Sequence, residues 1–183
     1  MVSEQKLLLV SFATHENIGY QNWTRAARAH GLAHRVVGIG QTWQGFMTKI
    51  RAYRDFCFQQ KNNRDTVLAI TDCYDVLSVA TSTEILFKYR QFEAPIVFGA
   101  ERFCWSDSCY PKQKATGDHR YLNSGCVIGH AEQLCAMYDW MIDQSNKVGG
   151  SQDDQMLMGH WASLHPTLCC HDTQSVLFPN STD

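Results

Sequence analysis

The feature that most constrains the fold is an alternation of short apolar runs with segments of helical periodicity. Apolar runs that predict strands occupy residues 6–12, 36–40, 66–71, 95–100, 121–129 and 175–178. Segments with apolar side chains on one helical face lie at residues 20–30, after Phe46, after Thr81, at 131–145 and at 153–164. Strands that alternate with helices are typical of a largely parallel sheet with helices on both faces. The sequence therefore predicts one α/β, Rossmann-like domain over residues 1–183.

The composition of the 183-residue chain excludes several classes of protein. Hydrophobic residues make up 44% and charged residues 19%, which is too apolar for a disordered chain. The net charge is −2, so we expect neither nucleic acid nor an anionic membrane as the main partner. The first apolar run is too short for a signal peptide, and no stretch is long enough to span a membrane. We therefore expect a soluble, cytoplasmic protein, and the sequence leaves its oligomeric state open.

The eight cysteines bear on the compartment. None forms a Cys-x-x-Cys pair, so the sequence supports neither a zinc ribbon nor a thioredoxin-like motif. Cys57 and Cys126 lie inside apolar runs, where cysteine behaves as a small core residue. We therefore expect mostly free thiols in a reducing compartment.

Two carboxylates follow the third predicted strand, at the edge where α/β sheets bind ligands. Asp72 and Asp75 flank Cys73 and Tyr74 at this strand end. Buried carboxylates require a compensating cation, and a divalent ion with oxygen ligands would supply it and also bind a diphosphate. Aspartate is also common in turns and at helix N-termini, so a turn with a helix cap is the alternative interpretation.

An aromatic and a basic residue follow the second predicted strand. Trp43 lies between Gly40 and Gly45, where its indole face could stack on the ring of a ligand. The alternative is a core tryptophan that closes the end of a helix. Lys49 lies one turn into the next helix, where it could neutralise a phosphate or simply be solvated.

Two further polar segments interrupt the apolar pattern. Asn123, Ser124 and Gly125 lie inside an apolar strand, and such local conflicts often mark a functional site. A simple β-bulge is the alternative. Asp153 and Asp154 open a helix, either as favourable charges at its N-terminus or as carboxylates that face a substrate.

Taken in order, these segments resemble a known family. The glycosyltransferase domain of the procollagen lysyl hydroxylases and their stand-alone relatives is similar in the stretches LLLVSFATHENIGY, GIGQTWQG, TDCYDVL, FGAERFCW, YLNSGCVIG and DDQ. The resemblance covers roughly residues 6 to 178. It implies a GT-A type fold, a UDP-sugar donor and a requirement for manganese (Mn²⁺).

The resemblance implies a metal and nucleotide site. Asp72 and Asp75 match the family's Asp-x-x-Asp, which coordinates manganese and, through it, the UDP diphosphate. Trp43 matches a tryptophan that stacks on uracil, and Tyr74 matches a tyrosine that packs on the nucleoside. Lys49 falls on a lysine near the diphosphate.

The resemblance also implies a pocket for the donor sugar. Asn123 matches an asparagine beside this sugar, and Glu101 and Trp105 match a segment that flanks the pocket. Asp153 and Asp154 match an acidic run that faces the donor sugar and the acceptor. These two acids and Asn123 are the expected catalytic residues, with Asp154 as a base or either acid as a stabiliser of the oxocarbenium-like centre. Retention at the anomeric carbon is expected.

The chain departs from the family pattern near its C-terminal end. The family's third metal ligand is a histidine directly after an aspartate, whereas the order here is His171, Asp172, Thr173. Thr173 occupies the histidine position, so either His171 or Asp172 substitutes or the third protein ligand is lost. The sequence stops at Asp183, before the family's His-x-Asn-Gly motif, as expected of a minimal or a truncated form.

The resulting hypothesis is a manganese-dependent hexosyltransferase that acts on a UDP-sugar. UDP-glucose and UDP-galactose are the expected donors, and the acceptor is a glycan or protein hydroxyl such as galactosyl-hydroxylysine in a collagen-like chain. The alternative is a degenerate, non-catalytic module that binds a nucleotide-sugar. A dinucleotide-binding Rossmann domain is disfavoured because no Gly-x-Gly-x-x-Gly follows the first strand.

Overall fold

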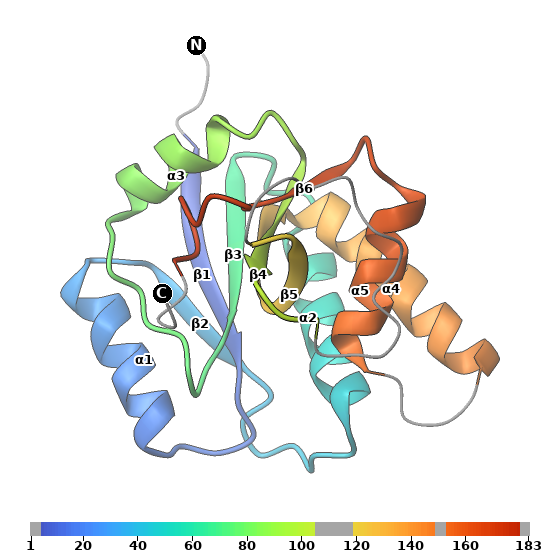
Figure 1. Cartoon of the computed structure of the whole chain (residues 1–183). Coiled ribbons are helices and arrows are strands. Elements are labelled where there is room, and N and C mark those ends of the chain that lie inside the picture. Colours follow the sequence, from blue (N-terminus) through green and yellow to red (C-terminus); the bar gives the residue numbers. More distant parts are fainter. Residues whose placement is uncertain (1–4, 105–118, 149–152, 180–183) are drawn as a thin grey trace.

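The computed structural model describes residues 5–104, 119–148 and 153–179. Within these ranges the chain forms a six-stranded sheet with helices packed on it (Figure 1). The strands are β1 (Lys6–Phe12), β2 (His34–Val37), β3 (Thr66–Asp72), β4 (Ile96–Glu101), β5 (Tyr121–His130) and β6 (Cys169–His171). The helices are α1 (Ile18–Ala29), α2 (Phe46–Gln60), α3 (Ser82–Arg90), α4 (Ala131–Val148) and α5 (Asp154–Leu164). The predicted α/β class is therefore confirmed.

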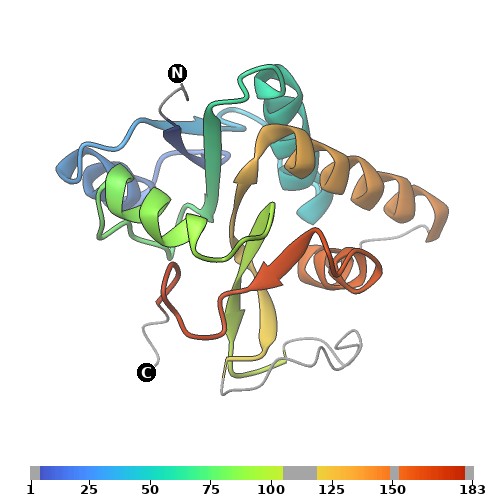
Figure 2. The same ribbon diagram turned by 90° about the horizontal axis from the view of Figure 1, so that it is seen from above.

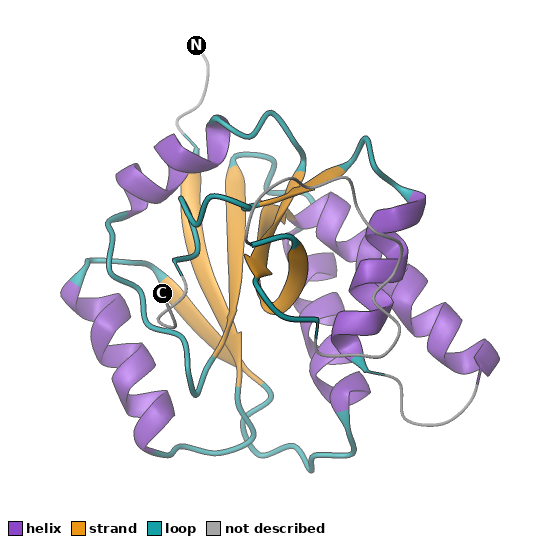
Figure 3. Cartoon of the chain, in the orientation of Figure 1, coloured by secondary structure: helices purple, strands orange, loops and turns teal. Residues whose placement is uncertain are grey.

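The sheet is mostly parallel, as the sequence predicts, with the strand order β2-β1-β3-β5-β4-β6. β1 pairs in parallel with β2 and with β3, and β4 pairs in parallel with β6. β5 runs antiparallel to both of its neighbours, β3 and β4 (Figure 3). One inverted strand therefore lies inside an otherwise parallel sheet.

Helices cover both faces of the sheet. α1 and α3 lie on one face, and α2, α4 and α5 lie on the other (Figures 1 and 2). The core under the second group includes Phe98, Tyr138 and Trp161, whereas the core under the first includes Leu9 and Trp23. Because successive residues of a strand face opposite sides, each central strand supplies side chains to both cores. This double burial explains why the strands are continuous apolar runs in the sequence.

Side-chain caps define where three of the helices begin. Asn17 caps α1 and Asp153 caps α5, each by accepting a hydrogen bond from a backbone N–H in the first turn. Thr81 caps α3, and its hydroxyl accepts from the N–H of Glu84. The spacing of Thr81 and Glu84 is that of a capping box, and it predicts this helix start correctly.

The strand predicted over residues 175–178 is wrong, because these residues form no strand, and the last strand of the described chain is β6, which pairs with β4. The carboxylate of Asp172 accepts the backbone N–H groups of Val176, Leu177 and Phe178. These N–H groups are therefore unavailable for a strand ladder. The apolar side chains that suggested a strand instead pack on the core under α1 and α3, where Leu177 and Phe178 are partly buried.

The cysteines agree in large part with the expectation of free thiols. Six described cysteines are free: Cys57, Cys73, Cys126, Cys135, Cys169 and Cys170. Cys104 is the exception, since it is disulfide-bonded. In the described parts of the chain, none of the helices is both long and apolar enough to cross a bilayer. The expected cytoplasmic location stays a prediction.

One edge of the sheet collects the strand ends that carry the candidate residues. Phe12 at the end of β1 pairs with Asp72 at the end of β3. Glu101 at the end of β4 pairs with Tyr121 at the start of the inverted β5. The chain therefore leaves the sheet after Glu101 and returns at Tyr121 on the same edge. Ligands of α/β sheets bind at this kind of edge.

Gly19 brings α1 into contact with the turn that follows β3. A Cβ atom on residue 19 would lie 2.7 Å from the carbonyl oxygen of Tyr74. Alanine normally stabilises a helix over glycine by about 1 kcal/mol, but here it would push two backbones apart. We therefore expect Gly19→Ala to lower the free energy of unfolding, measured in urea, by about 1 to 3 kcal/mol. Gln21→Ala, at an exposed site of the same helix, should change it by less than about 0.5 kcal/mol, and a stabilising Gly19→Ala would contradict the contact.

Candidate functional site

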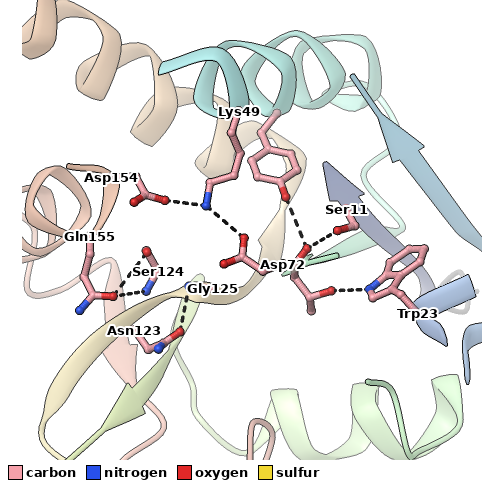
Figure 4. A network of polar contacts seen from close by, with 11 residues as sticks. Ser11, Trp23, Lys49, Asp72, Asn123, Ser124, Gly125, Asp154 and Gln155 are labelled. Carbon is pink, nitrogen blue, oxygen red and sulfur yellow. Dashed lines mark hydrogen bonds and ion pairs between the residues drawn. The ribbon is translucent and has the colours of Figure 1, made fainter. Parts of the chain in front are cut away.

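The centre of the site is the ammonium group of Lys49, which lies between two carboxylates (Figure 4). Its Nζ is 3.0 Å from Oδ1 of Asp72 at the end of β3, and 2.7 Å from Oδ2 of Asp154 at the start of α5. The side chains of Lys49 and Asp154 are only 11% and 4% exposed, whereas that of Asp72 is 36% exposed. The two ion pairs therefore join α2, β3 and α5 at one point.

Burial and charge act in opposite directions on these groups. Burial alone would lower the pKa of Lys49, but the charges of Asp154 and Asp72 outweigh it, and the pKa is raised. Burial raises the pKa of Asp72; Lys49 offsets part of this rise, and the charges of Asp154 and Asp75 add to it. Lys49 is therefore protonated at neutral pH, and the surroundings of Asp72 favour a further cation.

A bulge in β5 directly follows Asn123, because residues 124–126 have no partner on β4. The register between β4 and β5 shifts at Gly99, where pairing resumes with Asn123. Oδ1 of Asn123 accepts a 2.8 Å hydrogen bond from the backbone N–H of Gly125. A Cβ atom on residue 125 would lie only 3.1 Å from Oδ2 of Asp72. The segment is therefore a bulge that needs glycine to lie directly against a candidate metal ligand.

The first turn of α5 brings three polar residues to the site. Asp153 caps the helix, and Asp154 forms the ion pair described above. Gln155 hydrogen-bonds both Glu101 on β4 and Ser124 on β5. The sequence interpretation includes the two aspartates but misses Gln155, whose signal is its position directly after them.

Two aromatic side chains present half-exposed rings at this edge. Trp43 is 47% exposed, and its ring centroid lies 5.9 Å from those of Phe12 and Phe46. Tyr74 is 45% exposed, and its hydroxyl donates a 3.3 Å hydrogen bond to the carbonyl of His15. Each ring is held by neighbours and still offers apolar area to a ligand. Trp43 is therefore not the closed core residue of the alternative interpretation.

Asp72 and Asp75 supply carboxylate oxygens that are available to a cation. Among the residues that the structure describes, Oδ2 of Asp72 accepts no hydrogen bond, and Asp75 is exposed. Carboxylate oxygens fit Mn²⁺ and Mg²⁺. No group of three or more His, Cys, Asp or Glu side chains gathers within the described ranges. The two carboxylates therefore form part of a ligand set rather than a complete cage.

His171 and Asp172, the candidates for a third ligand, are both held inside the protein. Asp172 is fully buried, and its carboxylate accepts three backbone N–H groups from residues 176–178 at 2.6 to 2.8 Å. His171 packs edge-on against Phe98, and burial lowers its pKa to about 4. In the described part of the chain neither residue gathers with the two carboxylates at the end of β3. Their role as metal ligands stays a prediction.

The expected sugar-pocket segment is described in part. Glu101 is buried at the end of β4, beside the bulge of β5. Trp105 lies outside the described residues. The fold thus brings Lys49, Asp72, Asn123, Glu101, Asp153 and Asp154 to one edge of the sheet. Which ligand each contacts stays a prediction.

A family model described as the PLOD GT domain matches residues 3–161. This match includes the strand ends, the bulge and the first turn of α5 that build the site. The chain belongs to the PLOD GT domain family. The resemblance in the sequence motifs is therefore confirmed, and the α/β sheet is consistent with one GT-A-like domain.

Curated relatives of this PLOD GT domain chain are much longer proteins. It is 31% identical over 162 residues to a procollagen-lysine,2-oxoglutarate 5-dioxygenase of Drosophila melanogaster, a match to 82% of this chain and 22% of that protein. It is 32% identical over 145 residues to the Homo sapiens multifunctional procollagen lysine hydroxylase and glycosyltransferase LH3, a match to 73% of this chain and 19% of that protein. The chain therefore spans about a fifth of the length of these relatives.

Loss of the Lys49 charge is expected to destabilise this PLOD GT domain chain. Lys49→Met leaves the carboxylates of Asp72 and Asp154 close together without their cation. The free energy of unfolding should fall by about 3 to 5 kcal/mol, because breaking a buried ion pair leaves uncompensated charge. Lys88→Met, which breaks an exposed pair with Glu84, is the matched control and should cost less than about 1 kcal/mol in the same urea titration. Equal losses in the two variants would refute the central role of Lys49.

A substitution at Asp172 can distinguish two roles: holding the backbone of residues 176–178 in place, and binding a metal ion. Asp172→Asn weakens the acceptor for three backbone N–H groups, so we expect the free energy of unfolding to fall by about 2 to 3 kcal/mol. Calorimetric titration of the folded variant with Mn²⁺ should then give wild-type affinity. Unchanged stability with affinity weakened by about tenfold or more would instead identify Asp172 as a participant in metal binding.

Proposed function

We propose that the chain is a manganese-dependent glycosyltransferase that moves a hexose from UDP-glucose or UDP-galactose to an acceptor hydroxyl. The observation that carries the proposal is the pair Asp72 and Asp75 beside half-exposed Trp43 and Tyr74, in a chain of the PLOD GT domain family. Relatives are named both as procollagen lysine hydroxylase and as glycosyltransferase. Their names support galactosyl-hydroxylysine of a collagen-like chain as the acceptor.

The aromatic rings suit the nucleoside part of the donor. Trp43 would stack on uracil, because Phe12 and Phe46 hold its ring while nearly half of the side chain stays exposed. Tyr74 would pack on the nucleoside from the turn after β3. Rings that are held before binding orient the donor at a low entropic cost.

The carboxylates suit a cation and the diphosphate. Asp72 and Asp75 would hold Mn²⁺, which when bound supplies Lewis-acid stabilisation of the charge that develops on the leaving UDP. Lys49 binds Oδ1 of Asp72 and leaves Oδ2 for the ion. Lys49 thereby orients a metal ligand and keeps a positive charge near the diphosphate.

The α5 turn and the β5 bulge suit the sugar and the acceptor. Asn123 lies on the bulge that touches Asp72, so its amide would contact the donor sugar. Asp153 is exposed, and its carboxylate would face the acceptor. Asp154 is nearly buried and paired with Lys49, so we assign it to positioning rather than to proton transfer.

A non-catalytic module that binds a nucleotide-sugar is the second candidate. Its support is Thr173 at the position of the family's ligand histidine. Such a module would bind UDP without transferring sugar.

UDP release tests the two candidates. UDP-glucose and UDP-galactose are assayed with Mn²⁺ or with a chelator, with and without galactosyl-hydroxylysine. We expect release only with Mn²⁺, and a loss of about 100-fold or more in kcat/KM in Asp72→Asn, because several kcal/mol of charge stabilisation depend on the ion. Asp143→Asn, an exposed acid on α4, should keep wild-type activity.

The role of Trp43 has a matched control in the same assay. Trp43→Leu should raise the KM for the donor by about tenfold through lost stacking. Phe58→Leu removes a ring of almost equal exposure, 48%, from α2 and should leave KM unchanged. UDP binding without release from any donor would favour the non-catalytic module, and the absence of UDP binding would exclude both candidates.

A further inference from the structure

The side chain of Gln155 bridges two strands of the sheet from the first turn of α5. Its Nε2 donates a 2.8 Å hydrogen bond to Oε1 of Glu101 on β4. Its Oε1 accepts a 3.1 Å hydrogen bond from the backbone N–H of Ser124 on the β5 bulge. Figure 4 shows the carboxamide of Gln155 directed at Ser124, next to Asn123 and Gly125. One side chain thus connects α5, β4 and β5.

The polarity of this bridge is fixed at both ends. A carboxylate only accepts hydrogen bonds, so the NH₂ end of Gln155 must face Glu101. A backbone N–H only donates, so the oxygen end must face Ser124. Donor and acceptor therefore alternate from Ser124 through Gln155 to Glu101, and an amide is the side chain that satisfies both partners.

The bridge acts on the part of β5 that lies closest to Asp72. Ser124 is the first residue of the bulge, between Asn123 and Gly125. Oδ1 of Asn123 is occupied by the N–H of Gly125, so the amide of Asn123 is oriented as well. Among the described residues, Nδ2 of Asn123 has no protein acceptor, which leaves this donor for a ligand. A Cβ atom on residue 125 would lie 2.9 Å from Oδ1 of Asn123 and 3.1 Å from Oδ2 of Asp72, so a larger residue would have to displace one of these side chains.

We propose that Gln155 is a positioning residue whose carboxamide, held between Glu101 and the Ser124 N–H, fixes the β5 bulge so that Asn123 presents Nδ2 to the donor sugar. This inference rests on the proposed glycosyltransferase function. In this proposal α5 positions the donor sugar. Trp43 and Tyr74 bind the nucleoside, which is a separate role.

The proposal predicts a specific kinetic pattern. Displacement of the bulge misplaces the sugar, whereas Trp43 and Tyr74 lie outside β5 and keep their contacts with the nucleoside. The turnover number kcat should therefore fall, whereas the KM for the donor should change little. A general loss of folding would instead remove active protein and lower the free energy of unfolding.

Two substitutions test the polarity of the bridge. Gln155→Glu places a second carboxylate against Glu101 at hydrogen-bond distance, where both can only accept. Glu101→Gln alone still allows one amide to donate to the other. In the double variant the amide at 101 donates to the carboxylate at 155, which also accepts from Ser124, so both hydrogen bonds of the bridge can form again. Gln21→Glu adds the same charge at an exposed site of α1 and serves as the control.

The experiment is a double-mutant cycle with two readouts. Sugar transfer is measured as kcat and KM, and hydrogen exchange is measured in the peptide over residues 121–128. Gln155→Glu in the wild-type background should lower kcat by about 10-fold to 100-fold and accelerate exchange. In the Glu101→Gln background the same substitution should have almost no effect on either readout.

The outcomes separate this inference from the proposed function. The positioning role of Gln155 would be refuted if Gln155→Glu had equal effects in both backgrounds. It would also be refuted if the single variant kept wild-type kcat and wild-type hydrogen exchange. A fall in kcat equal to that of Gln21→Glu would overturn it too. If the wild-type chain transfers no sugar, the proposed function fails, and the exchange cycle then decides on the bridge alone.

Discussion

The ion pairs of Lys49 are the interaction on which the rest of the site depends. Its ammonium is the meeting point of α2, β3 and α5, and it lies within 3.0 Å of a carboxylate from each of the last two elements. Such a buried triad adds little net stability, because desolvation of the charges offsets their attraction. It does specify geometry, since neither Asp72 nor Asp154 can move away without exposing an unpaired charge. The bulge of β5 lies against Asp72 at Gly125, and Gln155 reaches the same bulge from α5.

The order and type of the elements are largely predictable from the sequence, because each element buries apolar side chains at its own period. The direction of β5 is not, since a buried parallel strand and a buried antiparallel strand have the same apolar pattern. The strand expected over residues 175–178 fails for a related reason. Apolar residues there indicate burial, but their backbone N–H groups donate to the carboxylate of Asp172 and so cannot pair with a neighbouring strand. Apolar periodicity indicates which side chains are buried. It does not indicate which groups form hydrogen bonds with the backbone N–H and C=O groups.

The site is predictable where a residue type conflicts with its surroundings. Asn123 and Gly125 interrupt an apolar strand, and Asp72 ends one, so each stands out in the sequence. Gln155 does not, because a polar residue in the first turn of a helix is ordinary. Its importance comes from contacts with Glu101 and Ser124, which are distant in the sequence and meet only in the folded sheet. The partnership of Lys49 with Asp154 is hidden for the same reason.

The inverted strand has a consequence for how this fold can diversify. Because Glu101 and Tyr121 are paired neighbours, the chain between them starts and finishes at one place on the ligand edge. This pairing holds both ends of the connection in place whatever the number of residues between them, and the entropic cost of joining two fixed ends grows only slowly with that number. Insertions at this point of the edge would therefore leave the ion pairs of Lys49 with Asp72 and Asp154 in place.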